Sequence, residues 1–381
     1  MKKWMLCLTL GIGLCIGAVP CQAEELASQA KAAILIEAKT RDVLFTKSEH
    51  ERMYPASTTK IMTMILIFEA LNEGSLQLDE MIHTSAYAAS MGGSQVYLEE
   101  NEVLPLSDML KAIAVSSAND CCVAVAEHIA GSSEAFVDMM NKKASELGLK
   151  DTHFVNCTGL HDENHYTSAY DLAMMAAYLI EIGQDQLFDL TSLYDAYIRE
   201  DTDQKFWLVN TNKALNPSQG IDGLKTGFTK EAGYCLVLTG QRDGLRMIAV
   251  VLNEEDPKVR NAEATALLES GLAQYTTTTL YRAGDVVTEM DVKHGRVSSV
   301  PVISAEDIQV PYPKTETYEP DYAIEIDRDE APLYTGEVVG YLKLMNEEAT
   351  VARYPLIVNQ DVERISYWSF FKELFGKLLY A

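Results

Sequence analysis

Three short strings in this sequence hold side chains that could perform serine chemistry. The first is Ser57-Thr58-Thr59-Lys60, at the beginning of a strongly apolar segment. A serine hydroxyl is a weak nucleophile, and a lysine with a depressed pKa can activate it as a base. Residues three apart share one helix face, and the unpaired N–H groups of a helix N-terminus favour a developing anion. The string therefore predicts an activated serine at the start of a helix.

The other two strings supply groups that such a serine needs around it. Ser117-Ala118-Asn119 offers a hydroxyl that could relay a proton and an amide that could hold both a lysine and a substrate carbonyl. Lys225-Thr226-Gly227 offers a second ammonium, which would help to keep Lys60 a free base, as desolvation would. The glycine of this string would let a substrate backbone approach a strand closely.

The order and spacing of the three strings carry more information than any string alone. Ser-x-x-Lys also occurs at Ser28–Lys31 and Ser369–Lys372, but neither place begins an apolar helix. The second string follows Ser57 by 60 residues, and the third begins 108 residues after the second. Penicillin-binding proteins and class A β-lactamases carry this set of strings.

The sequence resembles the low-molecular-weight penicillin-binding proteins that act as D-alanyl-D-alanine carboxypeptidases (serine peptidase family S11). The resemblance covers nearly the whole chain, and the matching strings are Tyr54-Pro55-Ala56-Ser57-Thr58-Thr59-Lys60-Ile61-Met62-Thr63, Ser117-Ala118-Asn119-Asp120, Asp151-Thr152-His153-Phe154, Thr158-Gly159-Leu160 and Gly223-Leu224-Lys225-Thr226-Gly227. It implies an α/β (α+β) transpeptidase fold like that of β-lactamases, an antiparallel sheet with helices on both sides. A small all-β C-terminal domain and a terminal amphipathic helix would follow.

The resemblance implies catalytic roles for five positions. Ser57 would be the acylated nucleophile and Lys60 its base. Ser117 and Asn119 would form the second catalytic element. The backbone N–H groups of Ser57 and Phe228 would form the oxyanion hole.

The resemblance also implies how the substrate is held. Lys225 and Thr226 would hold its terminal carboxylate, beside Gly227. Arg260, 35 residues past Lys225, falls where the family places an arginine near that carboxylate. At Thr211 the family often has a basic residue between two asparagines, so one secondary substrate contact differs here.

The implied activity is removal of the terminal D-alanine from peptidoglycan stem peptides ending in D-Ala-D-Ala, with β-lactams as covalent inhibitors and no cofactor or metal. A class A β-lactamase is one alternative, but no E-x-x-L-N string follows Asn119. A non-catalytic penicillin-binding scaffold is the other, and the intact Ser57 and Lys60 argue against it. A zinc site at His161-Asp162-Glu163-Asn164-His165 fits neither H-E-x-x-H nor H-x-x-E-H.

Hydrophobic patterning predicts the elements that position these strings. Two helical runs within 106–130 should meet at Ser116-Ser117, beside the second string. The other predicted elements are a hairpin over 32–46, helices over 57–72, 132–147, 168–183 and 257–275, strands over 233–240 and 245–252, and short β runs over 276–362. The catalytic domain is accordingly predicted over 24–275 and the β domain over 276–362.

The two ends of the chain predict an envelope location. Two lysines precede an uncharged apolar stretch over 4–20, and Cys21-Gln22-Ala23 suits a cleavage site. This predicts a signal peptide over 1–23, with a lipoprotein signal at the cysteine as the alternative. The segment 363–381 predicts an amphipathic helix lying on the outer face of the cytoplasmic membrane, or else docking on the β domain.

Composition bounds the remaining possibilities. The 381 residues suit two domains, and a hydrophobic fraction of 48% permits a large core. Asp and Glu number 56 against 31 Lys and Arg, for a formal charge of −25. Nucleic-acid binders need a basic face, so nucleic acid is not an expected partner. After the signal, Cys121, Cys122, Cys157 and Cys235 remain, and the first two are predicted to be buried free thiols.

Overall fold

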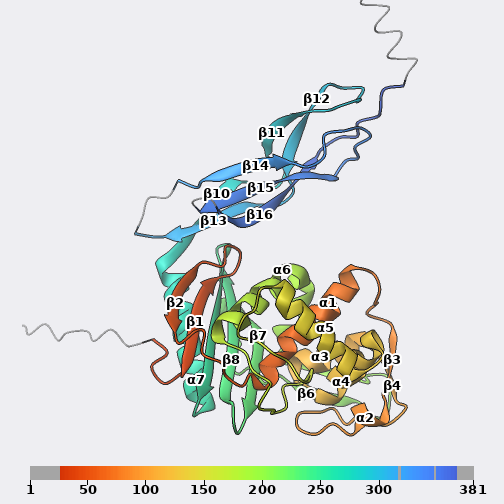
Figure 1. Ribbon diagram of the computed structural model, residues 1–381, viewed down its shortest axis with the longest axis vertical. Coiled ribbons are helices and arrows are strands. Elements are labelled where there is room, and N and C mark those ends of the chain that lie inside the picture. The colour runs from red at the N-terminus through yellow and green to blue at the C-terminus, as the bar shows by residue number, and fades with distance from the viewer. Residues whose placement is uncertain (1–25, 316–318, 347–348, 367–381) are drawn as a thin grey trace, which may run out of the picture.

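The computed structural model describes residues 26–315, 319–346 and 349–366. The predicted signal peptide and most of the predicted terminal helix lie outside these ranges. The chain forms a part made of helices and a sheet, which corresponds to the predicted catalytic domain and is called the catalytic part below, and an elongated β part that continues from its last helix (Figure 1). No helix within the described ranges is long and apolar enough to cross a membrane.

A five-stranded antiparallel sheet forms the centre of the catalytic part. Its strands are β1 (Ala32–Glu37), β2 (Val43–Lys47), β7 (Ile221–Thr229), β8 (Gly233–Arg242) and β9 (Leu245–Glu254), in the order β2-β1-β9-β8-β7. The predicted hairpins β1–β2 and β8–β9 are confirmed. β7, which carries the Lys-Thr-Gly string, was not predicted as a strand, and it lies at the edge of the sheet.

Helices cover both faces of the sheet, which confirms the predicted fold class. Helix α7 (Pro257–Gln274) packs on β8 and β9 from one side, while α6 (Ala169–Thr191) packs from the other. Because successive strand residues point to opposite faces, Ile34 and Ile36 join the core beneath α6, and Leu35 joins the core beneath α7. This two-sided burial explains why β1 reads as an unbroken apolar run.

The helical side of the sheet holds the first two chemical strings. A 3-10 turn, η1 (Ala56–Thr59), leads into α1 (Lys60–Asn72), where we predicted one continuous helix. Helices α3 (Leu106–Val115) and α4 (Asn119–Ala130) meet at the predicted junction. Further helices are α2 (Ala86–Ala89), α5 (Ser133–Glu146) and the short η2 (Pro217–Gln219). Two small antiparallel sheets pair β3 (Met81–His83) with β4 (Val103–Pro105) and β5 (Asp195–Ile198) with β6 (Phe206–Val209).

Helix α6 extends beyond its predicted end. The side chain of Ser168 caps its N-terminus by accepting from the N–H of Asp171, as predicted. The predicted end near Gly183 coincides with a kink at Gln184, whose φ is 44°. The helix resumes after that kink and reaches Thr191.

The β part has its own hydrophobic core. Its strands are β10 (Tyr275–Tyr281), β11 (Val286–Asp291), β12 (Ser299–Ser304), β13 (Ile308–Pro313), β14 (Tyr322–Ile326), β15 (Val338–Asn346) and β16 (Ala349–Val358). Five form a sheet in the order β11-β12-β16-β15-β14, and β10 pairs with β13. Contacts between Lys39 and Glu306 and between Thr277 and Asp243 join the two parts.

Candidate active site

Ser57 lies in the turn η1, whose shape depends on a close contact with Gly159. Ala56 has a φ of 48°, which is uncommon for a residue with a side chain. A Cβ at Gly159 would lie 1.8 Å from the carbonyl oxygen of Ala56, so only glycine fits. The hydroxyls of Thr58 and Thr59 donate to the carbonyls of Pro55 and Ala56 at 2.7 and 2.8 Å. These contacts fix the backbone that carries the serine.

Lys60 is fully buried beneath the partly exposed Ser57. Its Nζ lies 3.1 Å from Ser57 Oγ, and it donates to Asn119 Oδ1 and to the carbonyl of Thr158, both at 2.7 Å. Burial lowers the pKa of Lys60, although the nearby negative charge of Asp120 acts in the opposite direction. A neutral amine at this position can accept the serine proton.

Lys225 is equally buried, and its Nζ donates to the carbonyl of Thr226 at 3.1 Å. Burial lowers its pKa well below the usual value, and the positive charges of Lys60 and Arg260 lower it further. We expected both desolvation and the charge of Lys225 to keep Lys60 a free base. Burial is the main cause of the low pKa of Lys60, and the positive charges of the two buried lysines disfavour each other.

The second string forms the junction between α3 and α4. Ser117 has a φ of 65°, and its buried Oγ has no hydrogen-bond partner within the described part of the chain. The amide of Asn119 is oriented at both ends, because Oδ1 accepts from Lys60 while Nδ2 donates to the carbonyl of Gly92 at 2.7 Å. The backbone N–H of Asn119 donates to the carbonyl of Ser94 at 2.7 Å. Asn119 thereby joins the second string to Lys60.

The third string lies on edge strand β7, directly against η1. A Cβ at Gly227 would lie 2.8 Å from the carbonyl oxygen of Pro55 and 3.1 Å from the backbone nitrogens of Ser57 and Thr58. We predicted that this glycine admits a substrate backbone. The structure shows that it also lets β7 pack against the turn that carries Ser57, and the approach of a substrate backbone stays a prediction.

The remaining predicted substrate-binding residues lie around this strand. Thr226 Oγ1 donates to Thr211 Oγ1 at 2.7 Å. Phe228 is 54% exposed and its ring stacks on that of Tyr234, with centroids 4.2 Å apart. Arg260 is buried, with its guanidinium 5.8 Å from the centroid of the same tyrosine ring, and burial lowers its pKa. One stack thus links the β7 edge to α7, from which Arg260 projects.

His165 has a structural position. Its Nδ1 accepts from the N–H of Val155 at 3.1 Å, which leaves Nε2 to donate to Thr59 Oγ1 at 2.7 Å. Burial lowers its pKa to about 4, so the ring is neutral at pH 7. The described His, Cys, Asp and Glu residues form no group that could hold a metal ion.

The four cysteines that follow the predicted signal are all buried and free, which includes the predicted pair Cys121 and Cys122. Burial raises the pKa of Cys122 to about 11, and a protonated thiol is a poor nucleophile.

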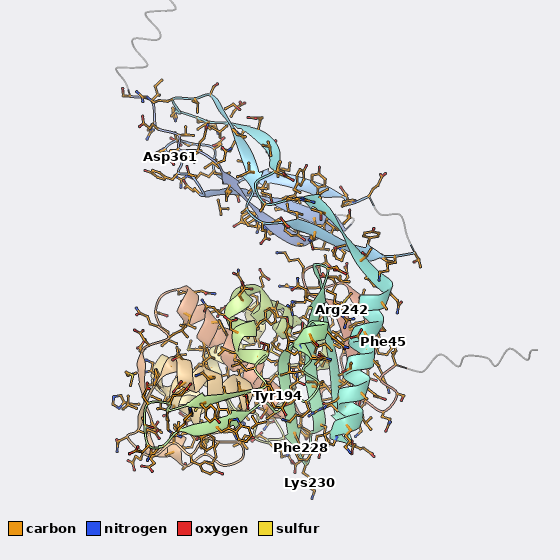
Figure 2. All side chains as sticks on the ribbon, turned by 180° about the vertical axis from the view of Figure 1, so that it is seen from behind. Phe45, Tyr194, Phe228, Lys230, Arg242 and Asp361 are labelled. Atoms are coloured by element: carbon orange, nitrogen blue, oxygen red, sulfur yellow. The ribbon has the colours of Figure 1, made fainter. Side chains whose placement is uncertain are left out.

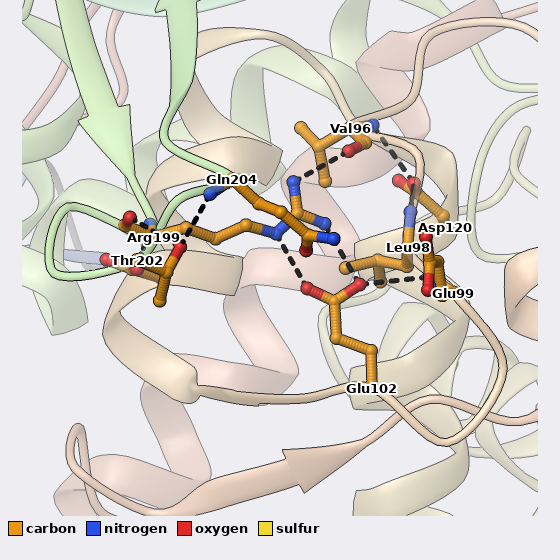
Figure 3. A network of polar contacts seen from close by, with 9 residues as sticks. Val96, Leu98, Glu99, Glu102, Asp120, Arg199, Thr202 and Gln204 are labelled. Carbon is orange, nitrogen blue, oxygen red and sulfur yellow. Dashed lines mark hydrogen bonds and ion pairs between the residues drawn. The ribbon is translucent and has the colours of Figure 1, made fainter.

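An ionic network that the sequence analysis missed supports the second string (Figure 3). Arg199 donates from Nε and Nη2 to Glu102 at 2.6 and 3.0 Å, and from Nη1 to the carbonyl of Val96 at 3.0 Å. Asp120, next to Asn119, accepts from the N–H groups of Val96 and Leu98. Because 97 residues separate Arg199 from Glu102, no local pattern in the sequence could reveal this pair.

Comparison with known proteins places this geometry in a family. A sequence model described as D-alanyl-D-alanine carboxypeptidase matches residues 20–256, and one described as penicillin-binding protein 5, C-terminal domain, matches residues 275–364. The chain belongs to the D-alanyl-D-alanine carboxypeptidase family, serine peptidase family S11. Within this family, the D-alanyl-D-alanine carboxypeptidase DacF of Bacillus subtilis is 42% identical over 99% of this chain and 98% of its own length.

Solved structures of similar proteins share the fold. PBP3 of Streptococcus pneumoniae, described as a peptidoglycan synthesis regulatory factor, has a TM-score of 0.72 at 29% identity, over 88% of this chain and 99% of its own. Penicillin-binding protein 5 of Haemophilus influenzae has a TM-score of 0.66 at 30% identity, over 88% and 98%. The carboxypeptidase interpretation of the sequence is thereby favoured over the β-lactamase and scaffold alternatives.

Proposed function

We propose that this protein is a serine-type carboxypeptidase that removes the terminal D-alanine from peptidoglycan stem pentapeptides through an acyl-enzyme on Ser57. The observation that carries the proposal is the Lys60 amine, fully buried and 3.1 Å from Ser57 Oγ, with a pKa lowered by burial. A general base is most effective when its pKa approaches the working pH. No cofactor or metal takes part in the proposed reaction.

In the acylation step, Lys60 Nζ takes the proton of Ser57 while Oγ attacks the carbonyl carbon between the two D-alanines. The resulting oxyanion accepts from the backbone N–H groups of Ser57 and Phe228. The proton passes from Lys60 through the hydroxyl of Ser117 to the leaving amine as the C–N bond breaks. The unpartnered Oγ of Ser117 supports this relay, because a buried hydroxyl without a partner is costly unless bound substrate supplies one.

The substrate is held at two places. Lys225, Thr226 and Arg260 bind the carboxylate of the terminal D-alanine, and the Asn119 amide, fixed by Lys60 and Gly92, donates to the carbonyl of the preceding residue. Deacylation then needs a water, whose proton goes to Lys60 as its oxygen attacks the ester carbon. The bond between that carbon and Ser57 Oγ then breaks, and Lys60 returns the proton to Oγ. β-Lactams enter the same path as mimics of the dipeptide and leave Ser57 slowly.

Two assays separate this function from its alternatives. We expect D-alanine release from a soluble pentapeptide by the wild-type protein and none by Ser57→Ala. A carboxypeptidase that forms its acyl-enzyme with peptide and with penicillin on the same serine should show both reactions. D-alanine release without penicillin labelling, or penicillin labelling without D-alanine release, would contradict it. Hydrolysis of penicillin at a rate similar to that of the peptide would favour the β-lactamase.

We also propose that the domain division predicted from the sequence holds and that the protein works in the cell envelope. The separate hydrophobic core of residues 290–362 and the two family matches support a boundary near Tyr275. Residues 1–23 would direct export, and 363–381 would anchor the protein on the membrane surface. The labelled Asp361 lies in the part of the β domain that is far from the catalytic part, so an anchor there would hold the active site away from the membrane (Figure 2).

A further inference from the structure

Thr211 lies between the second and the third chemical string. Its backbone N–H donates to the carbonyl of Val115 at 3.1 Å, two residues before Ser117. Its hydroxyl oxygen accepts from Thr226 Oγ1 at 2.7 Å, and the next residue, Gly227, packs against the turn η1. Thr211 is therefore part of the active site, although none of the three strings contains it.

Two buried asparagines hold Thr211 in this place. Asn210 donates from Nδ2 to two carbonyls at and just after the C-terminus of α6, at 3.2 and 2.8 Å, and its Oδ1 accepts from the N–H of Asn212 at 2.8 Å. Asn212 donates from Nδ2 to the carbonyl of Gly223 on β7 at 3.2 Å. Buried polar groups that are fully hydrogen-bonded make a segment rigid, so residues 210–212 are fixed against β7 before any substrate binds.

The contact with Thr226 places Thr211 on the side of the sheet that α7 covers. Successive strand residues point to opposite faces, and Thr226 shares its face with its cross-strand partner Leu236, which belongs to the core beneath α7. Arg260 projects from the same helix. The two hydroxyls therefore lie on the same side of the sheet as the arginine that is proposed to bind the substrate carboxylate.

The hydroxyl pair leaves one proton without an acceptor. A threonine hydroxyl has one proton to donate and two lone pairs that can accept. The proton of Thr226 is directed at Thr211, and Thr226 is only 5% exposed. Within the described part of the chain the proton of Thr211 has no acceptor, and Thr211 is only half-buried. Because a hydroxyl that accepts a hydrogen bond becomes a stronger donor, Thr211 is well placed to donate to a bound anion.

We propose that Thr211 binds the terminal carboxylate of the substrate, by donating its hydroxyl proton to a carboxylate oxygen while it accepts from Thr226. The inference rests on the proposed carboxypeptidase function. The contribution of Thr226 to carboxylate binding then passes through Thr211, and Arg260 supplies a positive charge. At a position where the family often has a basic residue, this chain thus keeps a substrate contact through a neutral donor.

The test compares variants of Thr211 on two soluble acyl donors. One is a pentapeptide that ends in D-Ala-D-Ala. The other carries the same peptide up to the penultimate D-alanine as a thioester of an uncharged thiol, so it has no terminal carboxylate. Loss of a hydrogen bond to a charged group costs about tenfold or more in affinity. Thr211→Val should therefore lose about that factor in kcat/KM on the pentapeptide, chiefly through KM, and much less on the thioester. Thr211→Ser keeps the hydroxyl and should retain most of the wild-type value on both donors.

Two further variants complete the comparison. Thr288→Val makes the same change at a half-buried threonine of β11, in the β domain, and should act as wild type on both donors. The double variant Thr211→Val with Thr226→Val should lose little more than Thr211→Val alone, because Thr226 acts through Thr211. If the losses of the two single variants multiply instead, Thr226 donates to the carboxylate by itself and the proposed contact is wrong.

Three other results would overturn the inference. Equal losses on the pentapeptide and the thioester would mean that the hydroxyl pair only ties residues 210–212 to β7. Wild-type KM and kcat in Thr211→Val would mean that the proton of Thr211 does not reach the substrate. If the wild type releases no D-alanine from the pentapeptide, the proposed function itself is wrong, and this inference with it. Thr211→Ala, which adds no atom, replaces the valine variant if urea unfolding shows that the latter is not folded.

Discussion

Gly159→Ala tests the packing that presents Ser57. The new Cβ would lie 1.8 Å from the carbonyl oxygen of Ala56, and real Cβ atoms essentially never approach within 3.0 Å of another atom. The turn η1 and the segment of Gly159 must therefore separate by about 1.2 Å. A displacement of about 1 Å at reacting groups can cost roughly 100-fold in rate. We expect the rate of acylation by penicillin to fall by about that factor.

A matched variant separates this displacement from the cost of the backbone conformation. Gly159 has a φ of 86° and Gly131 a φ of 81°, but nothing lies within 4 Å of a Cβ built at Gly131. Both alanine variants should lose about 1 kcal/mol or somewhat more of unfolding free energy from the left-handed conformation. Only Gly159→Ala should be acylated more slowly by penicillin. The rate can be measured by quenching of protein fluorescence in a stopped-flow instrument or by timed labelling with penicillin. Acylation at the wild-type rate by a folded Gly159→Ala protein would refute the argument.

Three further predictions follow from the site, its support and the chain end. Burial lowers the pKa of His165 from 6.5 to about 4, so the unfolded chain binds more protons than the folded chain between these pH values. The free energy of unfolding should therefore rise by about 3 kcal/mol from pH 4 to 6.5. A His165→Gln protein whose urea midpoints change with pH as steeply as those of the wild type would contradict this. The lysine of Arg199→Lys cannot reproduce the forked contact with Glu102, so kcat on soluble pentapeptide should fall severalfold with little change in KM. The control Arg52→Lys changes an exposed ion pair and should leave kcat and KM unchanged. A kcat equal to that of the wild type in Arg199→Lys would count against a positioning role for Arg199. Since the N–H of Ile365 still donates to His294 in the β domain, a chain ending at residue 366 should remain folded and active on soluble peptide but leave the membrane fraction, and continued sedimentation with membranes would locate the anchor elsewhere.

The sequence revealed the parts of this fold that are built from local patterns. The hairpin β8–β9, with its turn at Asp243-Gly244, and the junction of α3 and α4 follow from apolar periodicity and turn residues. β7 was missed because most of it is buried yet contains Lys225 and Thr226, so it shows neither alternation nor an apolar run.

The contacts that make the site work are of longer range and could not be read from neighbouring residues. Gly159 and Gly227 each pack closely against η1, and both lie far from η1 in the sequence. A low pKa for Lys60 was expected, but its main cause, complete burial, depends on the packing of the whole helical side.

The proposed mechanism requires that Ser57 is acylated both by penicillin and by the peptide substrate, with Lys60 as its base. The most direct measurement is the intact mass of the protein after incubation with penicillin, followed by mapping of the modified peptide, with D-alanine release from pentapeptide measured in parallel. We expect one added penicilloyl group on the peptide containing Ser57, and neither modification nor release in a folded Ser57→Ala variant. A penicilloyl group on another residue, or D-alanine release that survives in Ser57→Ala, would contradict it.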